Sequence, residues 1–380
     1  MKKLLTAKGV SLDRTVLGMV VVWWAAINAF AYTVFNRFHL EPDTAYLWMR
    51  HHSIWPEPSW DFIGMHARWD SGWYLDIVQH GYQYLGPGEL ANIVFFPLYP
   101  FLMKVVGIAL AESYVLAGWL ISSVALVGAA VMLARLVRDF HPKADPIFAV
   151  VAMLVFPTAI FLNAVYTESF FLLLSISAVY AVRKRAYGVA GVLGLLAALT
   201  RVTGVLLTIP LVWEYWREHG YRVSAFLKPK FLPLALPPLG TLGFFAYHYI
   251  AFGDPFLFLK VESSWGRSFN INEDHFDFST HAATTNFALD LMFVAFALAM
   301  VAFVMWKVRL SYGLYMIATL AVALSTGTMM SIGRYILVLF PMFIAIAYVK
   351  APHLRFGWLL TSILLLALYT TLFVHGLWAG

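Results

Sequence analysis

The chain has 380 residues, of which 61% are hydrophobic and only 12% charged. A water-soluble domain of this size needs more charge to stay dissolved, so the composition indicates a polytopic membrane protein. Cysteine is absent, which excludes disulfides and thiolate metal sites. The net charge of +6 is spread over short clusters between apolar runs, which fits membrane orientation and argues against a nucleic-acid-binding face.

Runs of roughly 20 apolar residues predict membrane-crossing helices, and about eleven such runs follow one another along the chain. They are 15–35, 114–137, 146–164, 168–183, 186–200, 203–216, 231–251, 286–306, 312–330, 335–349 and 356–375. We keep 15–35 as the first span, because it is long for a signal-peptide core and no cleavage site follows it. The stretch 186–216 is either two short helices or one broken helix, because Thr200-Arg201-Val202-Thr203 interrupts it.

The run 94–111 is a special case, because Pro97, Pro100 and Lys104 interrupt it. We expect it to lie in or against the outer membrane interface. With the N-terminus in the cytoplasm and 36–112 as one outer loop, most basic residues fall on the cytoplasmic side, as the positive-inside rule requires. Most acidic residues fall on the other side. The expected fold is an all-α polytopic membrane protein with one domain over 1–380, outer loops 36–112 and 252–285, and interfacial helices in the first loop.

The segment 68–82 of the first outer loop, RWDSGWYLDIVQHGY, combines carboxylates, basic groups and aromatic rings. Sites for sugars and lipid phosphates use flat aromatic faces, a carboxylate that takes a proton, and a cation. Asp70 is the predicted base. Its position just before a helix that begins near Ser71 also suits it to cap that helix, so capping is the alternative. We expect a structural role for Asp76.

Ionisable residues also fall at or near the outer ends of predicted helices, namely Glu168, Arg201 and Arg334. An ionisable group at membrane depth is unfavourable by several kcal/mol unless it is paired or hydrated, so these residues are functional candidates. The alternative is that Glu168 and Arg201 form a structural ion pair that fixes the register of two helices.

The second outer loop contains Lys260, Trp265 and Arg267, which are suited either to hold a phosphate and stack on a sugar or prenyl unit, or to anchor the loop at the interface. The loop also carries metal-binding side chains at irregular spacing. Because the spacing matches no known ligand pattern, we predict no dedicated metal site and leave a divalent cation open as a cofactor. These side chains are His275, Asp277 and His281.

Five short motifs follow one another between residues 68 and 341. They are Arg68-Trp69-Asp70-Ser71 with Gly81-Tyr82, Phe95-Phe96-Pro97-Leu98-Tyr99-Pro100, Tyr166-Thr167-Glu168-Ser169, Ala198-Leu199-Thr200-Arg201, and Gly333-Arg334-Tyr335 with Phe340-Pro341. In this order they resemble the PIG-V family of mannosyltransferases, especially its prokaryotic members. The resemblance implies a GT-C fold, a polyprenyl- or dolichyl-phosphate sugar donor, usually with mannose, and an active site on the non-cytoplasmic face.

By the same resemblance, Asp70 stands where GT-C enzymes place their catalytic carboxylate. The eukaryotic motif usually has His where this chain has Arg68, which argues against a GPI precursor as the acceptor. We therefore predict an inverting glycosyltransferase of the inner (plasma) membrane, multi-pass, with its site facing the periplasm or exterior. Asp70 is the general base, and the predicted substrate-binding residues are Arg68, Trp69, Trp73, Tyr74, Tyr166, Glu168, Arg201, Lys260, Trp265, Arg267, Arg334 and Tyr335.

The predicted partners are a polyprenyl-phosphate sugar donor, the lipid bilayer, and an acceptor that is a glycan, a glycolipid or a protein, with no nucleic acid. Two other functions are open: a transporter or flippase for lipid-linked saccharides, and a non-catalytic membrane subunit. Transporters often show inverted repeats and broken helices near the bilayer centre. The chain shows no such repeat, and its polar residues cluster towards one face, so we favour the glycosyltransferase.

Overall fold

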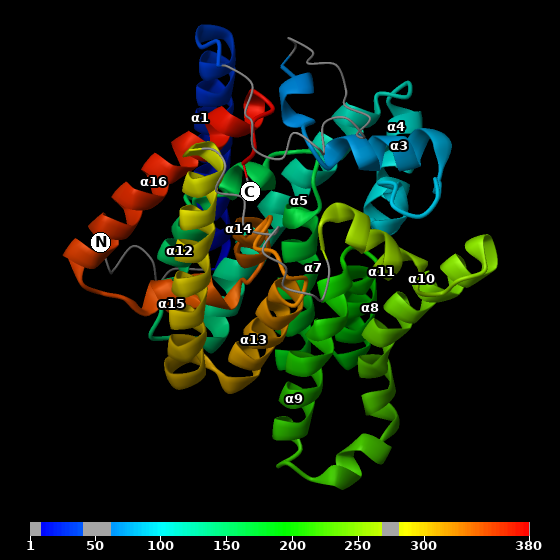
Figure 1. Ribbon diagram of the computed structural model, residues 1–380. Coiled ribbons are helices and arrows are strands. Elements are labelled where there is room, and N and C mark those ends of the chain that lie inside the picture. The colour runs from blue at the N-terminus through cyan, green and yellow to red at the C-terminus, as the bar shows by residue number, and fades with distance from the viewer. Residues whose placement is uncertain (1–8, 41–61, 268–280, 380) are drawn as a thin grey trace.

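A computed structural model describes residues 9–40, 62–267 and 281–379, and in these ranges the chain is helical and forms no strand (Figure 1). The longer helices pack around a large apolar core that extends from Leu12 to Ala379, and a smaller apolar cluster lies around Tyr74 and Tyr99. The α-helices are α1 (Gly9–Arg37), α3 (Ser71–His80), α4 (Leu98–Ala109), α5 (Tyr114–Phe140), α6 (Pro146–Leu154), α7 (Glu168–Arg183), α8 (Tyr187–Ala198), α9 (Thr208–Glu218), α10 (Leu236–Phe252), α11 (Leu257–Glu262), α12 (His281–Phe303), α13 (Leu310–Leu324), α14 (Ile332–Leu337), α15 (Pro341–Tyr348) and α16 (Pro352–Val374).

Among the described residues, four helical segments are long and apolar enough to cross a membrane: Leu12–Arg37, Tyr114–Phe140, Ala283–Val308 and Pro352–Val374. A fifth is added if the pair Pro229–Phe252 and Leu257–Trp265, bent by 88°, counts as one span. The chain is thus a helical membrane protein, as its composition predicts. The count of about eleven spans stays a prediction, because several of the expected spans are short or divided helices in the described parts of the chain.

Two of the expected spans are each divided into two pieces. In the run 146–164, α6 ends at Leu154 and only a short 3-10 helix, Ala159–Leu162, follows. In the run 335–349, α14 ends at Leu337, and α15 begins at Pro341, whose ring suits the first turn of a helix. Hydropathy detects the apolar composition of such runs but not the breaks within them.

The stretch 186–216 forms two helices, α8 and α9, which are joined by the 3-10 helix Val202–Leu207. The chain approaches the end of α8 so closely that a Cβ atom on Gly204 would lie 2.2 Å from the carbonyl oxygen of Ala197. Only glycine permits this approach, so Gly204 fixes the turn that carries Arg201.

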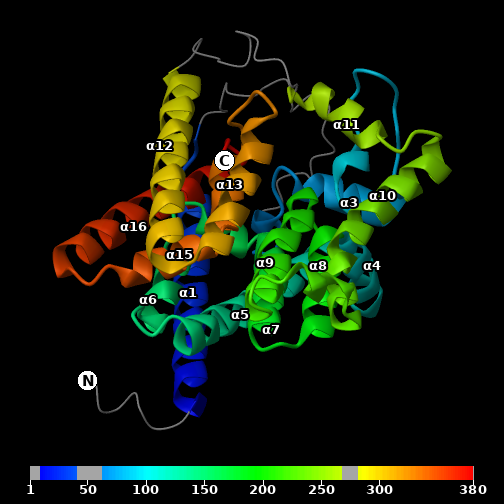
Figure 2. The same ribbon diagram turned by 90° about the horizontal axis from the view of Figure 1, so that it is seen from below.

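Helices that are close in the sequence pack against one another in the centre: α5 against α7, α7 against α8, and α8 against α10. In both views α3, α4, α10 and α11 lie on one side of the molecule, and α12, α15 and α16 lie on the other (Figures 1 and 2). The helices α3 and α4 fall inside the predicted first outer loop. With 12 residues, α4 is about 18 Å long, which is too short to cross a bilayer and agrees with the expectation for 94–111.

Candidate active site

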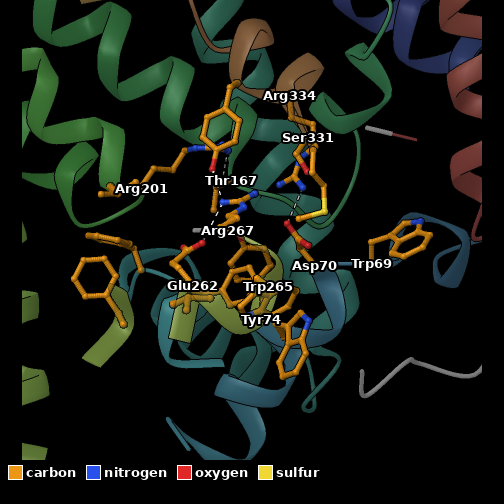
Figure 3. Close-up of a pocket in the computed structure, with 18 of the residues that line it drawn as sticks. Trp69, Asp70, Tyr74, Thr167, Arg201, Glu262, Trp265, Arg267, Ser331 and Arg334 are labelled. Carbon is orange, nitrogen blue, oxygen red and sulfur yellow. Dashed lines mark hydrogen bonds and ion pairs between the residues drawn. The ribbon is translucent and has the colours of Figure 1, made fainter. Parts of the chain in front are cut away.

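A cavity of about 1030 Å³, including its open mouth, lies where the ends of several helices meet (Figure 3). Its walls come from the start of α3, the residue before α7, the turn between α8 and α9, the segment α11 to Arg267, and the start of α14. Segments far apart in the sequence therefore contribute to one site.

Asp70 projects into this cavity from the position directly before α3, which begins at Ser71 (Figure 3). The residue before it, Trp69, has a φ of 51°, a left-handed conformation that is rare for a bulky residue. The backbone here is held by Tyr166, whose hydroxyl donates to the carbonyl of Arg68 (3.0 Å) and accepts from the amide of Asp70 (3.1 Å). Strained backbone held in this way is typical of functional sites.

The Asp70 carboxylate does not cap α3, so the capping alternative is wrong. Instead its Oδ2 accepts a hydrogen bond from Nη1 of Arg334 at 2.7 Å. The Asp70 side chain is 24% exposed and the Arg334 side chain 8%. The carboxylate therefore faces the cavity, while its partner arginine is fixed in the wall.

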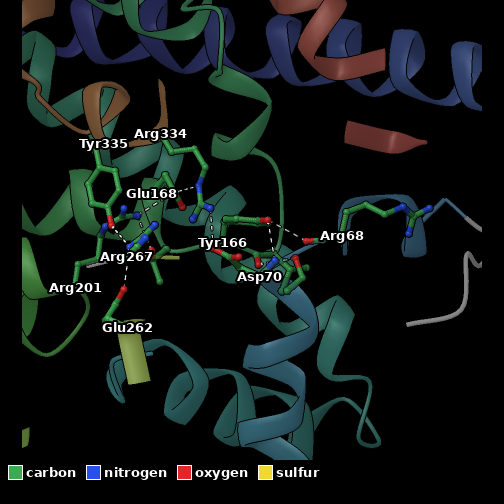
Figure 4. A network of polar contacts seen from close by, with 12 residues as sticks. Arg68, Asp70, Tyr166, Glu168, Arg201, Glu262, Arg267, Arg334 and Tyr335 are labelled. Carbon is green, nitrogen blue, oxygen red and sulfur yellow. Dashed lines mark hydrogen bonds and ion pairs between the residues drawn. The ribbon is translucent and has the colours of Figure 1, made fainter. Parts of the chain in front are cut away.

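Glu168 lies behind this pair, fully buried, and binds two arginines (Figure 4). Its Oε1 accepts from Nη1 of Arg201 at 2.9 Å and from Nε of Arg334 at 3.1 Å. Arg201 also donates to Oγ1 of Thr167 at 3.0 Å. The expected Glu168 to Arg201 pair thus exists, but it belongs to a larger network that extends through Arg334 to Asp70.

A second group of polar side chains lies beside this network, because the guanidinium groups of Arg201 and Arg267 both lie over the ring of Tyr335. Nη1 of Arg267 donates to the hydroxyl of Tyr335 at 2.9 Å and lies 3.4 Å from Oε2 of Glu262. Burial alone would lower the pKa of Arg267, but Tyr335 and Glu262 outweigh burial and raise it above its usual value. Arg267 therefore keeps its positive charge inside the cavity.

Aromatic rings form the floor of the cavity. Trp73 and Trp265 meet edge to face with ring centroids 5.1 Å apart, and Tyr74 lies beside Phe95 at 5.2 Å. Burial, and then the nearby Asp70, raise the pKa of Tyr74, so its hydroxyl stays protonated. The indole nitrogen of Trp265 is buried and donates to no described residue, which leaves a donor for a ligand.

The arginines keep hydrogen-bond donors beyond those that their partners use. Within the described residues, Arg201 and Arg267 each donate only through Nη1, and Arg334 through Nε and Nη1. A guanidinium group has five N–H donors in a planar fork that matches phosphate oxygens. The three arginines are thus able to bind a phosphate while Glu168 continues to hold two of them.

The cavity brings together most of the predicted site residues but not all. Trp69, Asp70, Trp73, Tyr74, Arg201, Trp265, Arg267, Arg334 and Tyr335 line it. Four other predicted residues lie outside the lining, and two of them, Glu168 and Tyr166, stand directly behind it. The side chain of Arg68 donates hydrogen bonds to backbone carbonyls, those of Gly64, Ala67 and Val374. The exposed side chain of Lys260 forms an ion pair with Asp254. The structure gives these four positioning or peripheral contacts, and a direct substrate contact for them stays a prediction.

Asp76 has the structural role that we expected. It is buried and accepts from Nδ2 of Asn92 at 2.6 Å, and it lies 2.9 Å from Nδ1 of His80. These contacts tie α3 to the following loop and leave Asp76 out of the cavity.

Several lining residues were missed by sequence reasoning. Glu262 was visible as a carboxylate in the second outer loop, next to the predicted Trp265 and Arg267. Trp378 gave no signal, because a tryptophan near the end of an apolar run is usual at a membrane interface. It reaches the cavity because its ring packs edge to face on Trp69, with centroids 5.0 Å apart.

No group of three or more potential metal-ligating side chains lies together in the part of the chain that the structure describes. Of the three side chains considered from the sequence, His275 and Asp277 lie outside the described residues, as does the side chain of His281.

Residues 57–214 match the model of a family described as mannosyltransferase (PIG-V). This match confirms the resemblance seen in the sequence motifs, of which the first four lie within the matched range. No curated protein sequence matches the chain. A similar solved structure is the archaeal oligosaccharyltransferase AglB from Archaeoglobus fulgidus, in complex with an inhibitory peptide and a dolichol-phosphate, at a TM-score of 0.46 and 12% identity. The alignment covers 95% of this chain and 56% of that one, so the chain spans about half the length of AglB.

Proposed function

We propose that this chain, whose residues 57–214 match the model of the PIG-V mannosyltransferases, is a membrane glycosyltransferase that moves one sugar, mannose in the first instance, from a polyprenyl-phosphate donor to an acceptor hydroxyl. The observation that carries the proposal is the ion pair between the partly exposed Asp70 carboxylate and Arg334. It lies in a cavity that is also lined by two further arginines and by aromatic rings. Such a cavity offers a base, a phosphate site and flat faces for a sugar.

The arginines act on the leaving group. When the bond between the anomeric carbon and the phosphate oxygen breaks, the lipid phosphate leaves with the electron pair and gains negative charge. The unused donors of Arg201, Arg267 and Arg334, whose side chains are largely buried, stabilise this charge. The departing phosphate is already a good leaving group, so no general acid is required.

Asp70 acts on the acceptor. The acceptor hydroxyl attacks the anomeric carbon from the side opposite to the phosphate and loses its proton to the Asp70 carboxylate, so the configuration is inverted in a single displacement. A donor phosphate bound to Arg334 shares this guanidinium with Asp70, which weakens the hold of Arg334 on the carboxylate and makes it a better base.

The distribution of basic residues predicts the side of the membrane on which the proposed site lies. The positive-inside rule puts the outer loops 36–112 and 252–285, which supply Asp70, Trp265 and Arg267, on the non-cytoplasmic side. The proposed site therefore faces the periplasm or exterior, where a lipid-linked donor is available and nucleotide sugars are not.

A choice of donors tests this function. Purified protein is given either mannose on polyprenyl phosphate or mannose on a nucleoside diphosphate, with a glycan acceptor. We expect release of polyprenyl phosphate and a mannosylated product from the first donor and none from the second. Transfer from the nucleotide sugar alone would contradict the proposal, as would transport of the lipid donor across vesicles without sugar transfer.

A further inference from the structure

A second depression lies at the end of α7 that is opposite to Glu168. The last turns of α7 and α9 and the turn before α13 form its walls, and it measures about 710 Å³ with its open mouth. Glu168 and Arg183 are the first and last residues of α7, so a rise of about 1.5 Å per residue separates them by about 22 Å. Figure 1 shows the end of α9 at the lower edge of the molecule, away from α3. We call this depression the basic cleft; it is lined by Phe140, Val182, Arg183, Glu214, Arg217, Glu218 and Arg309.

The two carboxylates of the basic cleft are already matched by cations. Arg309 binds both oxygens of buried Glu214 through Nε and Nη2, and Ser311 donates to the same carboxylate at 2.6 Å. Glu218 forms an ion pair with Arg185. Within the described residues, each carboxylate of the cleft is therefore already bound by another arginine, and none is left as the sole partner of the remaining two arginines.

These remaining arginines are Arg183 and Arg217. Nε of Arg183 lies 3.7 Å from Glu214, and its guanidinium lies over the ring of Phe140 at 4.2 Å, which holds it in place with little exposure. Arg217 is exposed and forms no ion pair within the described residues. One fixed and one exposed guanidinium thus face the same opening with surplus positive charge, which is the arrangement that binds a phosphate group.

The surface beside the cleft indicates that the phosphate belongs to a lipid. The segment 221–232, which follows α9, alternates exposed apolar and basic residues. Val223 is 73% and Leu227 87% exposed, and exposed Arg222, Lys228 and Lys230 stand between and beside them. Apolar side chains that enter a bilayer surface, interspersed with basic side chains, are typical of segments that lie on anionic membranes.

We propose that the basic cleft binds the phosphate group of an anionic phospholipid, at the membrane face opposite to the catalytic cavity. Arg183 and Arg217 contact the phosphate, and the apolar side chains of 221–232 contact the acyl region. This site does not depend on the proposed transfer reaction, because it is about 22 Å from Glu168.

The test is lipid retention. Full-length protein is taken from vesicles with equal parts of phosphatidylglycerol and phosphatidylcholine, and native mass spectrometry counts the lipids that stay bound. Arg217→Gln removes the exposed contact without touching Glu214. Arg14→Gln is the matched control, because Arg14 is an exposed arginine of α1 that lies outside both the cleft lining and the segment 221–232. Thermal melting of both variants checks that they are folded.

We expect the wild-type protein to retain phosphatidylglycerol over phosphatidylcholine. Arg217→Gln should bind phosphatidylglycerol about tenfold more weakly, because it loses one charge-assisted contact, and Arg14→Gln should bind it as the wild type does. Equal loss in the two variants would show only a diffuse surface charge and would overturn the proposal. Displacement of the lipid by millimolar inorganic phosphate would also overturn it, since the cleft would then take a soluble phosphate.

Discussion

Glu168 is the residue whose replacement tests the charge network most sharply. Glu168→Gln keeps a hydrogen-bond acceptor for Arg201 and Arg334 but removes the buried negative charge between them. Breaking a buried ion pair by removing one partner destabilises a protein by roughly 3–5 kcal/mol. Because the glutamine still accepts hydrogen bonds, we expect about 3 kcal/mol, which lowers the melting temperature by several degrees.

Donor phosphate should partly reverse this loss, because it supplies the missing negative charge. A ligand at about 100 times its dissociation constant stabilises a protein by about 2.7 kcal/mol. If the variant binds polyprenyl phosphate about tenfold more tightly, the same ligand concentration stabilises it by about 4.1 kcal/mol. Polyprenyl phosphate therefore raises the free energy of unfolding of the variant by about 1.4 kcal/mol more than that of the wild type. The measurement is a larger rise in the melting temperature of the variant when the ligand is added.

Asp76→Asn is the matched control. Asp76 is buried in α3 near the cavity, but its partners are His80 and Asn92 rather than arginines. We expect this variant to lose stability and to gain no more from polyprenyl phosphate than the wild type. The reasoning is refuted if Glu168→Gln melts like the wild type, or if polyprenyl phosphate stabilises it no more than it stabilises Asp76→Asn.

Three further substitutions test the walls of the cavity. Arg334→Ala should raise the dissociation constant for the donor and lower turnover, each by tenfold or more, because it removes a phosphate contact and the partner of Asp70. A change in acceptor affinity alone would contradict this prediction. Trp378→Ala should raise the KM for a saccharide substrate about tenfold, and Trp378→Phe, which keeps an aromatic face, should raise it much less. Trp306→Ala is the control and should leave this KM unchanged, because Trp306 is exposed and lies outside the cavity. Lys260→Ala should leave turnover within about twofold, because Lys260 pairs with Asp254 away from the cavity.

Much of the site was visible in the sequence, because charged residues are conspicuous in an apolar chain. Glu168, Arg201 and Arg334 each lie at or near the end of an apolar run, and the requirement that such charges be paired predicts that they meet. Asp70 was visible in the aromatic segment 68–82 of the first outer loop. Which pairs form was not predictable. Arg334 reaches Asp70 across 264 positions, and this contact depends on how α3, α7 and α14 pack.

The helix boundaries were only partly predictable. The run 168–183 agrees with α7, whose first residue, an acidic one, suits the positive end of the helix dipole. The division of 146–164 and 335–349 was missed, because hydropathy averages over the turns at Val155 and Val338. Trp378 was missed for another reason, since its place in the cavity depends on the strained backbone at Trp69 and on the hydrogen bond from the Trp69 indole to the carbonyl of Leu377, 2.9 Å long.

The role of Asp70 is the centre of the account, and Asp70→Asn tests it most directly. Purified wild-type and variant proteins are given labelled mannosyl polyprenyl phosphate and acceptor, and both product formation and donor binding are measured. We expect transfer by Asp70→Asn to fall by at least a hundredfold, as for the loss of a general base, while donor binding is kept. Wild-type turnover by Asp70→Asn would remove this carboxylate from the reaction and contradict the mechanism.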